Sequence, residues 1–205
     1  MKTGSILSIL LALLFSIPVF AHDITEGDME RLGRHAAQGD TGAVDKIEDA
    51  YNQLYKNIDF QKEMDRARSN LVLMNAAFDK IAKAVKGDDA SDPAFQSLIY
   101  ATGRPNLAPF TTSAFGTAAA AGHQQALDVL LHYKEHGLLL SSAVEGLIPV
   151  AANNNKDAVD FLVKVINDNS MKSLWMMASQ GLVAAANSGN PDAKAALAKY
   201  AVSTQ

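Results

Sequence analysis

The chain has 205 residues, of which 48% are hydrophobic, with no cysteine and a formal net charge of −4. This composition excludes a disulfide-stabilised miniprotein, a collagen-like chain and a disordered polymer. With 18 basic and 22 acidic residues, the chain has no surplus of positive charge to neutralise phosphates, so we expect no nucleic-acid partner.

The first 21 residues have the pattern of a secretory signal peptide. Lys2 supplies a positive charge, an apolar run spans residues 6–15, and Val19-Phe20-Ala21 forms a small-residue cleavage site. The apolar run is shorter than the roughly 20 residues that span a bilayer. We expect cleavage after Ala21 to leave residues 22–205 as one all-helical domain. That domain is predicted to be periplasmic or secreted, without a membrane attachment.

The rest of the chain is predicted to be all-α. Apolar residues recur at steps of three and four, and alternating strand patterns are nearly absent. Asp92-Pro93 and Asn190-Pro191 each place a capping side chain before a proline, which predicts two helix N-termini. Glycines predict helix C-termini at positions 39, 87, 103, 122, 137 and 189.

One long helix is predicted over residues 60–86, with Asp59 capping its start and Gly87 its end. Eight apolar residues in this segment alternate at spacings of four and three: Phe60, Met64, Ala67, Leu71, Met74, Phe78, Ile81 and Val85. Such a heptad pattern is compatible with a dimeric coiled coil or with a long helix that packs on its own neighbours. We favour the second interpretation because the pattern covers only three and a half heptads.

The second half of the chain contains three similar segments. They begin at Phe115, Leu147 and Leu182, which are 32 and 35 residues apart, and each has an alanine 11 residues later: Ala126, Ala158 and Ala193. Weaker copies lead to Ala43 and to Ala94. A period of about 32–35 residues with two helices per unit predicts an α-solenoid of helix-turn-helix repeats.

Residues 119–131 (AAAGHQQALDVLL) resemble the helix-turn-helix core of an ankyrin repeat. The Thr-Pro-Leu-His opening of that family is missing, and residues 137–147 read as helix rather than as a β-hairpin. Two full helices per unit are closer to a HEAT-like repeat. The resemblance, which covers residues 107–202, implies a HEAT-like or ankyrin-like exported protein.

Three sets of residues are candidate metal ligands. His132 and His136 fit the H-x-x-E-H spacing of inverzincin metalloproteases, but the motif ends at Gly137, which favours a solvated helix end. His22 would become the N-terminus after cleavage, where histidine can bind copper, but the enzymes that do so resemble β-sandwiches. Asp88, Asp89 and Asp92 lack the spacing of a calcium loop. We expect no cofactor.

Trp175, Met176 and Met177 are the candidate binding residues, because adaptable methionine beside tryptophan is typical of contact surfaces. The sequence predicts a non-enzymatic exported protein, a monomer or weak dimer, that binds a protein partner through a helical-repeat surface. The alternative function is a small exported metal-dependent hydrolase or metal-binding protein that uses His132 and His136. A third hypothesis is a structural protein that dimerises through residues 60–85.

Overall fold

The computed structural model describes residues 24–56, 58–59, 63–133 and 140–203. This part of the chain consists of α-helices and short 3-10 helices without any strand, so the all-α prediction is confirmed. The α-helices are α2 (Glu26–Ala36), α3 (Thr41–Tyr55), α4 (Met64–Ala84), α5 (Pro93–Thr102), α6 (Ala108–Ala120), α7 (Gln124–Tyr133), α8 (Leu140–Ala152), α9 (Lys156–Asn167), α10 (Trp175–Asn187) and α11 (Pro191–Ser203). The 3-10 helices are η1 (Pro105–Leu107) and η2 (Asn169–Leu174). The predicted signal peptide, residues 1–21, lies outside the described residues.

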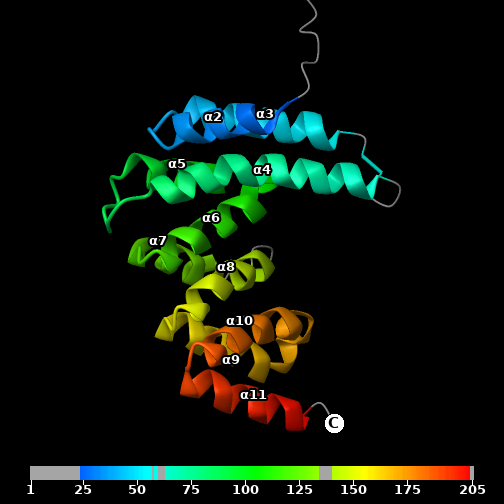
Figure 1. Cartoon of the computed structure of the whole chain (residues 1–205), viewed down its shortest axis with the longest axis vertical. Coiled ribbons are helices and arrows are strands. Elements are labelled where there is room, and N and C mark those ends of the chain that lie inside the picture. Colours follow the sequence, from blue (N-terminus) through cyan, green and yellow to red (C-terminus); the bar gives the residue numbers. More distant parts are fainter. Residues whose placement is uncertain (1–23, 57, 60–62, 134–139, 204–205) are drawn as a thin grey trace, which may run out of the picture.

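The helices form an elongated arrangement that runs from α2 at one end to α11 at the other (Figure 1). The even-numbered helices make one row, in which α2 packs on α4, α4 on α6, α6 on α8 and α8 on α10. The odd-numbered helices line this row: α3 packs on α2, α5 on α4, α7 on α6, α9 on both α8 and α10, and α11 on α10. Packing contacts are therefore made mainly between helices that are close in the sequence.

Four of the turns between paired helices have the same backbone geometry. In each, one residue has a positive φ, its amide donates to the carbonyl three residues back, and the next amide donates to the carbonyl five residues back. This bonding pattern satisfies the last carbonyls of the preceding helix and requires a residue that tolerates the left-handed region. The positive-φ residues are Gly39, Gly122, Asn154 and Gly189.

The residue that follows the positive-φ position begins the next helix. The side chains of Asp40, Asn155 and Asn190 accept hydrogen bonds from the backbone amides of residues 43, 158 and 193, at 3.2, 3.1 and 3.0 Å. Asp92 caps α5 in the same way, through the amide of Phe95 at 2.9 Å. The N-termini predicted at Asp92-Pro93 and Asn190-Pro191 are confirmed.

Small residues allow the even-numbered helices to approach closely. A Cβ on Gly33 would lie 2.2 Å from the carbonyl oxygen of Ala77 in α4, and a Cβ on Gly116 would lie 2.3 Å from the carbonyl oxygen of Gly146 in α8. The alanines that define the sequence pattern are also buried: Ala43, Ala94, Ala126, Ala158 and Ala193.

The long helix is shorter than the sequence indicates. α4 begins at Met64 and ends at Ala84, its N-cap is Glu63 without a side-chain capping bond, and the predicted cap Asp59 lies four residues earlier. Phe60 lies outside the described residues. Among the described heptad residues, Ala67 and those from Met74 onward are buried, whereas Met64 and Leu71 are exposed. One reason is that α6 covers the second half of α4, where Phe78 stacks on Phe110 with ring centroids 5.9 Å apart.

Candidate interaction surface

The three predicted binding residues stand at the start of α10 and have different surroundings. The Trp175 indole N–H donates to the carbonyl oxygen of Asp168 at 3.1 Å, and its ring meets the edge of Tyr200 at 5.7 Å. Met177 is partly buried against the core. Met176 is 74% exposed. The structure therefore places Trp175 and Met177 partly within the packing and leaves Met176 as an outward-facing side chain.

Met176 belongs to a larger surface that we call the neutral face. It consists of the exposed stripes of α6, α8 and α10, whose residues recur at helical spacing. These stripes are the parts of α6, α8 and α10 that the packing on neighbouring described helices leaves exposed. The residues of the neutral face are Pro109, Ser113, Thr117, Ser141, Glu145, Pro149, Met176, Gln180 and Val183.

The neutral face differs in charge from the opposite side of the molecule. Glu145 is the one Asp, Glu, Lys or Arg residue in α6, α8 and α10, whereas α7, α9 and α11 contain eight such residues. Exposed helix surfaces are normally rich in charged residues, as α9 and α11 are. Met176 could be identified from the sequence, but the face could not, because its signal is a lack of charge on three helices that are separated in the chain.

The candidate metal ligands lie outside the neutral face. His132 is exposed in the last turn of α7, while His136 and His22 lie outside the described residues. Asp92 caps α5, and Asp88 accepts from the amide of Gln124 at 2.7 Å. Hydrogen bonds from the backbone and hydroxyl of Ser91 lower the pKa of Asp89. Within the described ranges, no three His, Cys, Asp or Glu side chains gather in a way that could hold a metal ion.

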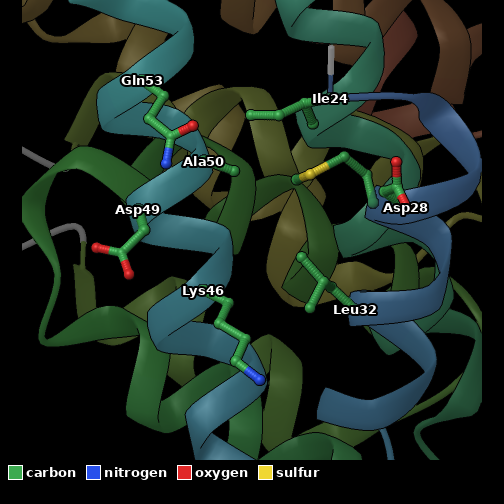
Figure 2. A pocket seen from close by; sticks show the side chains of 8 residues that line it. Ile24, Asp28, Leu32, Lys46, Asp49, Ala50 and Gln53 are labelled. Atoms are coloured by element: carbon green, nitrogen blue, oxygen red, sulfur yellow. The ribbon is translucent and has the colours of Figure 1, made fainter. Parts of the chain in front are cut away.

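An open groove of about 360 Å³ lies between α2 and α3, at the first end of the helix row (Figure 2). Its apolar lining includes Ile24, Leu32 and Ala50, and charged side chains such as Lys46 and Asp49 stand beside them. These charges have opposite signs, and the side chains that carry them do not converge on one position.

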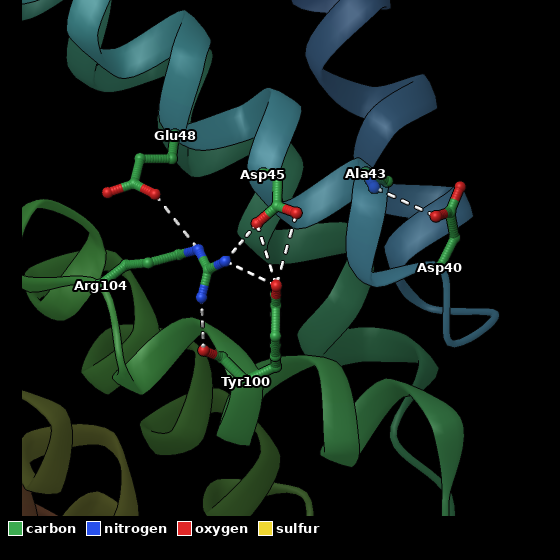
Figure 3. Close-up of polar contacts among 6 residues, drawn as sticks. All are labelled: Asp40, Ala43, Asp45, Glu48, Tyr100 and Arg104. Carbon is green, nitrogen blue, oxygen red and sulfur yellow. Dashed lines mark hydrogen bonds and ion pairs between the residues drawn. The ribbon is translucent and has the colours of Figure 1, made fainter.

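A cluster of polar side chains joins α3 to the end of α5 (Figure 3). Arg104 pairs with Asp45, and its Nε lies 3.2 Å from a carboxylate oxygen of Glu48, although that N–H is not aligned for a hydrogen bond. The guanidinium carbon also lies 3.9 Å from the centroid of the Tyr100 ring, and the Tyr100 hydroxyl donates to Asp45 at 3.2 Å. Sequence reasoning missed this cluster because Asp45 and Arg104 are 59 residues apart.

Electrostatics in the Arg104 cluster favour the charged state of the arginine. Burial acts to lower the pKa of the guanidinium, but hydrogen bonds to Asp45 and Tyr100 outweigh it and raise the pKa above its usual value. A permanently charged arginine enclosed by two carboxylates and an aromatic ring has no proton to exchange near neutral pH. The cluster therefore works as a cross-link between helices.

The chain matches no known family model, no curated protein and no solved structure. In the part that the structure describes, no helix combines the length and the apolar character needed to cross a membrane.

Proposed function

We propose that the protein is a non-enzymatic, exported interaction module that binds a protein partner through the neutral face. The observation that carries the proposal is the exposure of Met176 and Val183, at 74% and 47%, on a surface whose single charged residue is Glu145. Export is proposed from the pattern of residues 1–21 alone.

The charge distribution supports a protein as the partner. The cores of protein interfaces are depleted of charged residues and enriched in methionine and aromatic residues. A nucleic acid would require a positively charged surface, and the neutral face contains neither lysine nor arginine. Exposed methionine and valine on a stripe with little charge are explained by a partner that covers them.

We further propose that the helix pairs are units of an α-solenoid of the HEAT-like or ankyrin-like type. Four turns with the same hydrogen-bond pattern support this proposal, as do the single row of even-numbered helices and the buried alanines three residues after the positions of Asp40, His123, Asn155 and Asn190. Stacked helical units build an extended surface, which suits the binding of another protein.

The experiment compares three forms of the purified protein as bait in an extract of its own cell envelope. Met176→Ser removes the most exposed apolar side chain of the neutral face, and Met64→Ser removes a comparably exposed methionine on α4, away from that face. We expect Met176→Ser to weaken capture of the partner by about 1 kcal/mol or more, roughly fivefold in affinity, and Met64→Ser to have no effect.

The affinity should then be measured on the isolated pair by biolayer interferometry. Both variants should keep the thermal midpoint of the parent, because neither side chain is buried. Equal capture by the parent and Met176→Ser would show that the partner binds elsewhere, and the absence of any captured protein would count against an interaction module.

A further inference from the structure

The first half of α4 carries an exposed apolar stripe that no other described helix covers. Met64, Leu71 and Val72 are 54%, 45% and 54% exposed. They are half of the six exposed large hydrophobic side chains in the described chain, and they fall within nine residues. At the spacing of an α-helix, the three side chains flank the position of Arg68 on both sides.

The second half of the same helix is packed on both sides. There α2 contacts α4 through Gly33 and Ala77, and α6 contacts it through Phe110 and Phe78. The first half has a contact on the other side, where the Asn70 side-chain amide donates to the carbonyl of Leu54 in α3 at 2.8 Å. The exposed stripe is therefore the portion of α4 that extends past α6.

The charges on the stripe are self-complementary. Asp65 and Arg68 are fully and 74% exposed, and they form a loose pair at 3.7 Å. One acid and one base on the same surface cancel, so two copies of this surface do not repel each other. In an antiparallel arrangement with a two-fold axis at the height of Ala67, Met64 of each copy lies beside Leu71 of the other, and Arg68 of each copy lies beside Asp65 of the other.

We propose that the stripe formed by Met64, Asp65, Arg68, Leu71 and Val72 is a contact surface between two copies of this chain, packed antiparallel. It is separate from the neutral face and does not depend on the proposed function. Three apolar side chains per copy bury much less than the 1,200–2,000 Å² typical of stable interfaces, so the dimer is weak and forms at high protein concentration, on the order of 100 µM.

Sedimentation velocity over a concentration series, up to about 1 mM, measures this association. The parent should shift from monomer to dimer, and Leu71→Glu should remain monomeric because it places a charge in each apolar contact. Val183→Glu is the matched control, since Val183 is similarly exposed, at 47%, but lies on α10. It should dimerise like the parent. Unchanged thermal midpoints would show that both variants are folded.

A charge exchange tests the antiparallel geometry itself. Asp65→Arg places two positive charges on each copy, and Arg68→Asp places two negative charges, so each variant alone should dimerise at least about tenfold more weakly than the parent. An equimolar mixture should recover dimers, because the arginine introduced at position 65 of one copy then meets the aspartate introduced at position 68 of the other. A parent that stays monomeric, a Leu71→Glu variant that still dimerises, or a mixture that fails to recover dimers would each overturn the proposal.

Discussion

Glycines occupy two different kinds of position in this chain. Gly39, Gly122 and Gly189 have positive φ in turns between helices. Gly33 and Gly116 have ordinary helical geometry but lie where the backbone of the neighbouring helix leaves no room for a side chain. The sequence reveals the first kind, because the apolar pattern stops there. The second kind follows only from the contact between helices.

Substitutions of Gly33 and Gly27 test the close approach of α2 and α4. Gly33→Ala forces a methyl group to within 2.2 Å of the Ala77 carbonyl oxygen, so the two helices must separate, at an expected cost of about 1–3 kcal/mol. Gly27→Ala, in the first turn of the same helix, meets only the Thr25 hydroxyl at 3.8 Å. It should be neutral or stabilise the protein by up to about 1 kcal/mol.

Urea unfolding of the two variants gives the comparison. A Gly33→Ala variant as stable as the parent would mean that α2 and α4 are farther apart than the structure places them. Both substitutions gain the same helix propensity in principle, so a difference between them reports on the neighbouring helix.

Among the elements, the turn after α8 joins three helix pairs. The Asn153 side-chain amide donates to the carbonyl of Ala120 at the end of α6, at 2.7 Å. The Asn154 amide donates to the carbonyl of Ser188, just after α10, at 3.0 Å. Two adjacent asparagines thus satisfy one carbonyl in the turn before and one in the turn after, which sets the spacing of the three turns.

The two asparagines make different demands on the backbone, which leads to a prediction. Asn153→Ala loses one exposed hydrogen bond and should cost about 0.5–1.5 kcal/mol. Asn154→Ala loses a similar bond and also places alanine at φ 60°, which adds about 1–2 kcal/mol. Asn154→Gly should fall between the parent and Asn154→Ala, because glycine accepts the positive φ.

Guanidinium chloride denaturation of the three variants measures these free energies of unfolding. Equal losses for Asn153→Ala and Asn154→Ala would show that the positive φ at Asn154 carries no strain.

Helix positions could be predicted from the sequence to the extent that local signals mark them. Capping residues located Asp92 and Asn190 correctly, since a cap bonds within its own helix. The start of α4 was predicted too early, and Leu71 was assigned to a continuous seam, because the heptad pattern does not show where α6 ceases to cover α4. The Arg104 cluster and the neutral face depend on which helices become neighbours, so no local pattern contains them.

Across the whole molecule, each helix packs mainly on its immediate neighbours in the row. A cavity at one end should therefore affect that end most strongly. Leu182→Ala in α10 removes a fully buried side chain, at a cost of about 2–5 kcal/mol to the local structure. Amide hydrogen exchange should become faster in α8, α9, α10 and α11, and stay unchanged in α2 and α3.

The corresponding variant at the other end of the row is Ile47→Ala, which removes an equally buried side chain in α3. It should accelerate exchange in α2, α3 and α4 and leave α10 and α11 unaffected. Uniform acceleration along the chain in either variant would show that the row unfolds as a single cooperative unit.

The order of contacts along the row also bears on how the chain folds when it becomes available from its N-terminus onward. Each even-numbered helix after α2 finds its packing surface on the helix pair immediately before it in the chain. The chain can therefore bury the apolar face of α4 on α2 before α6 is available, and then continue pair by pair. Contacts that are short in sequence close quickly and at little entropic cost. The apolar surfaces of the first helix pairs therefore do not have to stay exposed to solvent until the last helices are available.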